Sequence, residues 1–136
     1  MSYNHAQLDF IASDIDSLTE ASTFTDGTTN EYDSVVIDVT DVDRVVLQGR
    51  VTGENASADG DITFNILGSV DGVLWDTVIV ATVTVTMNGT TQVVKSDPLN
   101  TRGYRLLKLG TIGNDDTTYA GEAVNLKCGK SYGHLQ

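Results

Sequence analysis

The chain has 136 residues, of which 40% are hydrophobic, and these values fit one folded domain with a single core. The net charge of −11 argues against direct binding to nucleic acid or to an anionic membrane surface, because both need clustered lysine and arginine. The single cysteine, Cys128, excludes an intrachain disulfide and suits synthesis in a reducing cytoplasm.

The first 43 residues carry ten of the nineteen acidic residues and no lysine or arginine. Four apolar residues in this stretch fall at helical spacing, namely Leu8, Ile11, Ile15 and Leu18. Against a stable helix stand the many Ser, Thr, Gly and Asn residues that follow, and the absence of any base to offset the acids. We therefore interpret residues 1–30 as an extended acidic arm, loose alone and ordered against a partner, and residues 31–136 as the folded domain.

Beyond the arm the hydrophobic pattern has a period of two and β-branched residues are frequent, which predicts strands. The clearest half-buried strand is Asp61–Gly68, where Ile62, Phe64 and Ile66 alternate with polar residues. In the strand before it Gly49 is a possible bulge that resets the alternation. The predicted strands are Val35–Val39, Arg44–Thr52, Asp61–Gly68, Leu74–Met87 as one bent strand or two, Thr91–Ser96, Gly103–Ile112 and Tyr119–Lys127.

Turn residues separate these strands, and Asn88-Gly89 is the dipeptide that favours a tight hairpin. Seven or eight short strands with Gly, Asn and Asp turns are typical of a two-sheet antiparallel sandwich. The predicted fold class is therefore all-β, an antiparallel β-sandwich or jelly roll preceded by the acidic arm.

Membrane, metal and catalytic signals are weak in this sequence. The apolar-leaning run 78–85 is too short to span a bilayer, and the N-terminus lacks a secretory signal pattern. The Asn55–Gly60 turn approaches a calcium loop, but Ile66 stands where a bidentate Glu is needed. His5 and His134 lie near the termini, and no nucleophile motif is present. We expect no metal, no cofactor and no enzymatic activity.

Cys128 lies between Lys127 and Lys130, a setting that favours a lowered thiol pKa. A lone cysteine at the end of a strand is more often inert, and we favour that interpretation. Glycosylation sequons at Asn55 and Asn88 are interpreted as turns.

Basic residues gather late in the chain, with Arg102, Arg105 and Lys108 near one strand and Lys127 and Lys130 near the next. Two interpretations stay open. These residues form a cationic patch that faces the acidic arm of a neighbouring copy, or they keep the sheet edges soluble and unpaired.

The string Gly68-Ser-Val-Asp-Gly-Val-Leu-Trp75-Asp76 contains the only tryptophan. Its Ser-x-Asp-Gly-x-x-Trp pattern resembles a strand-to-turn motif of discoidin-like and carbohydrate-binding β-sandwiches, and of sandwich domains in phage virion proteins. Trp75 either caps the core beside the turn, which we favour, or offers a stacking platform to a sugar.

As a whole, the chain resembles the small jelly-roll decoration (cement) proteins of tailed bacteriophages. The shared features are short all-β length, abundant Thr and Val, a polar N-terminal arm, an acidic surface, a single cysteine and no catalytic motif. The resemblance implies a homotrimer on the capsid exterior that is made in the host cytoplasm, binds the major capsid protein and links neighbouring capsomers. The arm would bury Leu8, Phe10, Ile11, Ile15 and Leu18 on the capsid.

Two alternatives remain open at this stage. One is a carbohydrate-binding or receptor-binding β-sandwich module, which needs an exposed Trp75. The other is a structural component of a tail or head fibre, which needs trimerisation without binding to the capsid surface.

Overall fold

The computed structural model describes residues 5–26 and 32–132 of the chain. None of the residues in these two ranges lies in a helix, so no helix that could span a membrane is found among them. The strands are β1 (His5–Asp9), β2 (Ser22–Thr25), β3 (Ile37–Asp38), β4 (Val42–Gly53), β5 (Asp61–Ser69), β6 (Ala81–Thr86), β7 (Thr91–Lys95), β8 (Leu99–Asn100), β9 (Leu106–Asn114) and β10 (Gly121–Tyr132).

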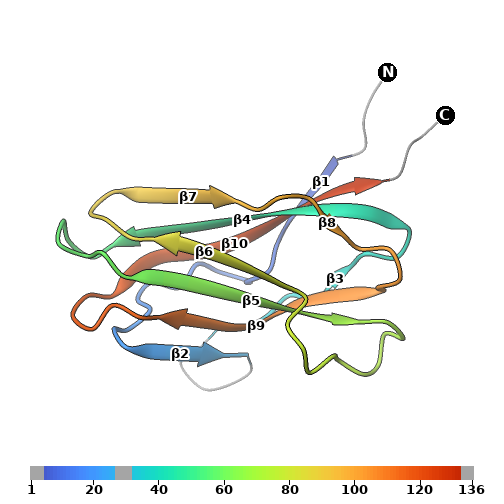
Figure 1. Cartoon of the computed structure of the whole chain (residues 1–136), viewed down its shortest axis with the longest axis horizontal. Coiled ribbons are helices and arrows are strands. Elements are labelled where there is room, and N and C mark those ends of the chain that lie inside the picture. Colours follow the sequence, from blue (N-terminus) through green and yellow to red (C-terminus); the bar gives the residue numbers. More distant parts are fainter. Residues whose placement is uncertain (1–4, 27–31, 133–136) are drawn as a thin grey trace.

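The strands form two antiparallel sheets that pack face to face. Sheet 1 has the order β1-β10-β4-β7, and sheet 2 has the order β2-β9-β5-β6. The two-residue strands β8 and β3 pair with β4 and β9. Figure 1 shows the long strands β4, β5, β9 and β10 running along the long axis of the molecule.

The pairing of the eight longer strands is nested. The first pairs with the last, β2 with β9, β4 with β7, and β5 with β6. This nested pairing of two sheets is the topology of a jelly roll. The predicted all-β jelly-roll sandwich is therefore confirmed.

The core lies between the sheets and follows the predicted alternation. Ile62, Phe64 and Ile66 of β5 are fully buried, as are Val45, Leu47 and Val51 of β4. Gly49 does not interrupt the alternation of β4. A Cβ at Gly49 would lie 2.9 Å from Val85 and 3.0 Å from Phe64, so side chains of the facing sheet fill its place.

The Asn88-Gly89 turn differs from the expected hairpin. Because β6 pairs with β5 and β7 pairs with β4, this turn carries the chain from sheet 2 to sheet 1. Neither residue has the positive φ that the predicted hairpin turn needs. Glycine is required here because the backbone of Ala56 lies 2.7 Å from the place of a Cβ on Gly89.

Residues 5–26 pack as part of the sandwich. β1 pairs with β10, and isolated bridges join Ile15 to Val124 and Leu18 to Gly121. These extended bridges, and not a helix, place Ile15 and Leu18 in the core. The packing differs from the expected loose arm, because the main chain is hydrogen-bonded to β10 while the apolar side chains face inward. The division into an N-terminal arm (residues 1–30) and a β-sandwich domain (residues 31–136) stays a prediction.

Candidate interaction surface

Exposed apolar side chains gather at one end of the sandwich, in the loop that joins β5 to β6 (residues 70–80, the β5–β6 loop). Figure 1 shows this loop at the end where β9 begins. Three residues of this loop have high solvent exposure, namely Val73 at 76%, Leu74 at 72% and Val78 at 75%. Five of the ten exposed large apolar side chains among the described residues lie in this loop: Val70, Val73, Leu74, Val78 and Ile79.

The tip of the β5–β6 loop is held by the Asp71 side chain. Its carboxylate accepts hydrogen bonds from the main-chain N–H groups of Val73 and Leu74, each at 2.8 Å. These bonds, that of Leu74 first, lower the pKa of Asp71. The Ser69 hydroxyl accepts the N–H of Gly72 at 3.0 Å, and Gly72 has a φ of +81°, which favours glycine.

The base of the loop is fixed to β5 and to the residue before β9. The main-chain N–H of Asp76 donates to Gly68 O, and that of Val80 donates to Ile66 O, both at 2.8 Å. The Arg105 guanidinium donates to Asp71 O at 3.1 Å. The exposed valines and leucine therefore stand on a preorganised loop, which reduces the entropy that a partner must remove on binding.

Trp75 lies outside the core and is half-buried. The Lys108 ammonium is 4.6 Å from the centroid of its ring, a cation–π contact on one face. Capping of the core, the favoured prediction, does not describe this position. Stacking on a sugar stays a prediction.

Together these contacts explain the Ser-x-Asp-Gly-x-x-Trp pattern that stands out in the sequence. Ser69, Asp71 and Gly72 build the turn, and Trp75 anchors the loop against Lys108. The sequence prediction missed the surface itself, because it assigned residues 74–80 to a strand. The available signal was the run Val78-Ile79-Val80, which lacks the alternation of the true strand β6.

Arg102 and Arg105 both contact groups of their own chain. Arg102 forms a salt bridge with Asp43 at 3.0 Å, which lowers the pKa of that carboxyl. Arg105 donates to Asp71 as described above. A cationic patch that faces a neighbouring copy stays a prediction.

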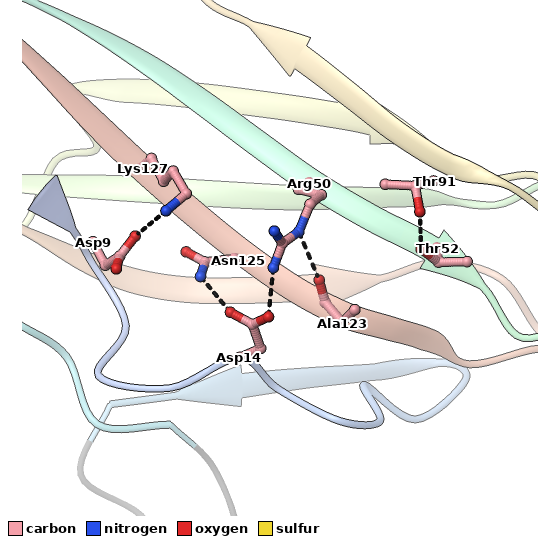
Figure 2. Close-up of polar contacts among 8 residues, drawn as sticks. All are labelled: Asp9, Asp14, Arg50, Thr52, Thr91, Ala123, Asn125 and Lys127. Carbon is pink, nitrogen blue, oxygen red and sulfur yellow. Dashed lines mark hydrogen bonds and ion pairs between the residues drawn. The ribbon is translucent and has the colours of Figure 1, made fainter. Parts of the chain in front are cut away.

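The acidic N-terminal segment also finds basic partners within the chain, on the outer face of sheet 1. Asp9 forms a salt bridge with Lys127 at 2.9 Å, and Asp14 forms one with Arg50 (Figure 2). The Asn125 side-chain amide donates to the same Asp14 carboxylate. The N-terminal acids are therefore paired with basic residues of the same chain, and of these Lys127 belongs to the late basic group.

The structure places most of the predicted arm contacts inside the fold. Phe10, Ile11, Ile15 and Leu18 are all buried in the core, and Leu8 alone of the five is exposed, at 36%. Contact of these residues with a capsid stays a prediction, and the four buried ones would have to leave the core to make it.

The acidic turns serve the fold. Asp116 is buried, and its carboxylate accepts N–H groups of Thr118 and Tyr119 at 2.8 Å and those of Asp59 and Gly60 at 3.1 and 3.0 Å. These bonds lower the pKa of Asp116 to about 2. Within residues 5–26 and 32–132, no cluster of three or more His, Cys, Asp or Glu is placed to hold a metal ion.

Cys128 is fully buried in the core between the sheets. Burial raises the pKa of its thiol to about 11, and Lys130 opposes this shift only in part. A protonated, buried thiol is a poor nucleophile, which agrees with the prediction that Cys128 is inert.

Comparisons with known proteins identify the fold. No protein-family model and no curated protein sequence matches the chain. The chain superposes over its whole length on 40% of the PBSX exported protein XepA, with a TM-score of 0.53 and 13% identity. The chain thus spans well under half of that protein, and the likeness shows a shared fold.

Two further solved structures are less similar. One, from the work on Bacillus endospore appendages that form disulfide-linked pili, is matched over 96% of this chain and 88% of its own, with a TM-score of 0.35 and 14% identity. The Tobacco streak virus coat protein is matched over 100% and 92%, with a TM-score of 0.35 and 12% identity. These scores are too low to indicate a common fold.

Proposed function

We propose that this protein is a structural component of a virus particle, and specifically a decoration protein that binds the outer surface of a capsid and links neighbouring capsomers. The observation that carries the proposal is the rigid, apolar β5–β6 loop at one end of a jelly roll. Contiguous exposed apolar side chains on a soluble domain mark a surface that binds a partner. The proposal includes no catalytic activity.

Adhesion through the loop has a simple physical basis. Val73, Leu74 and Val78 are each more than 70% exposed, so burial against the major capsid protein removes most of their apolar surface from water. Each such side chain contributes on the order of 1 to 2 kcal/mol. Asp71 and Arg105 already hold the loop in place, so binding costs little conformational entropy there and this gain is kept.

Assembly into a homotrimer is part of the proposal. One loop binds weakly, but three linked loops bind the same capsid with a high effective concentration. The resemblance of the sequence to jelly-roll decoration proteins supports this part. The solution mass by light scattering after gel filtration tests it, and a monomer that stays monomeric on the capsid would contradict it.

The test of the proposed function is co-sedimentation with capsids assembled from the major capsid protein of the same genome. We expect the full chain to sediment with these capsids and the double variant V73D/L74D to stay in the supernatant. Val93→Asp is the matched control, because Val93 is 53% exposed and lies on β7, away from the loop. All three proteins should keep the same thermal unfolding midpoint within a few degrees.

The outcomes separate the parts of the proposal. Failure of the unmodified chain to bind capsids would overturn the decoration function. Recovery of the unmodified chain in purified tails or fibres would show that it is a component of those structures instead. Binding of capsids by V73D/L74D as tight as that of V93D would leave the function standing and show that another surface makes the contact.

A further inference from the structure

The outer face of sheet 2 carries small polar side chains in two rows that cross its strands β6, β5, β9 and β2. The residues alternate with buried core residues such as Phe64, Val83 and Ile112, so they face away from sheet 1. One row is Thr84, Thr63, Gly113 and Thr23, and the next is Thr82, Asn65, Thr111 and Thr25.

Hydrogen bonds along the second row fix its side chains. The Thr82 hydroxyl donates to Asn65 Oδ1 at 3.1 Å, and Asn65 Nδ2 donates to the Thr111 hydroxyl at 2.9 Å. Beside the first row, the Thr86 hydroxyl donates to Asp61 Oδ1 at 2.7 Å. The face therefore presents an ordered array of hydroxyl and amide groups.

A shallow depression of about 340 Å³ opens in this face at Gly113. Its lining includes Ser22, Thr23, Asp61, Thr63, Gly113 and Asp115. A Cβ at Gly113 would meet a single atom within 4 Å, the Thr23 hydroxyl oxygen at 3.8 Å. Packing within the chain therefore does not require glycine at this position. A glycine inside a strand often marks a place that a ligand approaches closely.

We infer that this depression binds a carbohydrate, with neutral or amino sugars as the chemical class. Hydroxyl groups both donate and accept hydrogen bonds, as sugar hydroxyls do, and the Asp61 and Asp115 carboxylates accept from them. The lining holds two acids and no base, so phosphorylated or sulfated ligands are disfavoured.

The carbohydrate site is separate from the proposed capsid contact. Gly113 and Thr63 lie on the face of sheet 2, whereas Val73 and Leu74 lie on the β5–β6 loop at its end. The inference therefore does not rest on the proposed function, and either can fail alone.

The test uses two glycine variants that make the same chemical change on opposite sheets. G113V fills the depression, and the open space around Gly113 lets the fold accept it. G129V is the control on sheet 1, where a Cβ would meet only Val46 O, at 3.9 Å. Both variants place a β-branched residue within a strand, which suits the backbone there.

The full-length ¹⁵N-labelled chain is titrated with a panel of neutral, amino and acidic oligosaccharides and with oligolysine, and amide shifts are followed by NMR. We expect a neutral or amino oligosaccharide to shift the amides of Thr23, Thr63 and Gly113 with a millimolar Kd. G113V should weaken this binding by about tenfold or more, and G129V should leave it unchanged, each tenfold step being about 1.4 kcal/mol.

Several results would overturn the inference. These are no shift with any sugar at millimolar concentration, binding of acidic sugars alone, or G113V binding as tightly as G129V. A shift caused by oligolysine and by no sugar would assign the face to a cationic peptide instead.

Discussion

The Arg105 guanidinium donates a hydrogen bond to the main-chain oxygen of Asp71 at 3.1 Å, and this contact ties the start of β9 to the turn of the β5–β6 loop. The carboxylate of the same aspartate holds the N–H groups of Val73 and Leu74. The loop is thus fixed on both sides of its tip, and its exposed apolar residues have a defined geometry.

Replacement of Asp71 by alanine should loosen the loop and leave the sandwich folded. The variant loses Asp71 Oδ1, the one acceptor of both the Val73 and the Leu74 N–H groups, while β5 and β9 keep their pairing. We expect faster hydrogen exchange at Val73 and Leu74, unchanged exchange in β5, and weaker capsid binding. Asp97→Ala, an exposed acid in another loop, is the control and should change none of the three.

The Asp71 prediction fails if Val73 and Leu74 exchange equally fast in the unmodified chain and in D71A. That result would mean that Arg105 and the backbone bonds of Asp76 and Val80 suffice to order the loop.

Phe10→Ala should destabilise the whole domain. Phe10 is fully buried between the sheets, so its truncation leaves a cavity and should lower the free energy of unfolding by about 3 to 5 kcal/mol. Leu8 lies two residues earlier and its side chain is 36% exposed. Leu8→Ala should therefore lower the free energy of unfolding by less than about 1 kcal/mol. Urea unfolding followed by tryptophan fluorescence measures both values.

Equal stability of F10A and L8A would support the loose arm predicted from the sequence. A large difference between them would show that the N-terminal segment belongs to the cooperative fold.

The contrast between β5 and residues 8–18 shows what sequence pattern can predict. In β5, Ile62, Phe64 and Ile66 alternate strictly, and alternation over a few residues is a local property of a strand. In the N-terminal segment, Ile11, Ile15 and Leu18 reach the core through single bridges to distant residues, such as that between Ile15 and Val124. Such long-range contacts leave no local period, so the sequence pattern could not show that this segment packs into the core.

The interaction surface was harder to predict for a related reason. Val78 and Ile79 have the composition of a buried strand, yet they belong to an exposed loop. Whether an apolar side chain is buried depends on which strands pack over it, and the local sequence does not determine that packing. The turn at Asp71-Gly72 was predicted, because the Asp and Gly preferences of turns are local.

Acid should unfold the protein in part through Asp116. The pKa of Asp116 is about 2 in the folded protein, below its ordinary value of 3.8. The ionised carboxylate therefore makes its full contribution to stability at any pH above about 3.8. The stabilisation is lost as the pH falls from about 3.8 to about 2. Asp116→Asn should flatten the fall of the thermal unfolding midpoint in this window and lower the midpoint at neutral pH. Asp115→Asn, at an exposed position next to it, is the control for the loss of one charge.

An equally steep acid transition in D116N and D115N would contradict the role of Asp116. The transition would then come from other carboxyls with lowered pKa, such as Asp38 and Asp71.

Gly49→Ala tests the packing between the two sheets. The added methyl would lie 2.9 Å from Val85 and 3.0 Å from Phe64, both fully buried and with little room to move. Overpacking of this kind should lower the free energy of unfolding by about 1 to 3 kcal/mol. Gly113→Ala makes the same change in β9 at a site that is open, so it should be neutral or slightly stabilising, because alanine loses less backbone entropy than glycine on folding. Urea unfolding of the two variants side by side measures the difference, and equal stability would show that the sheets separate enough at Gly49 to accept a methyl group.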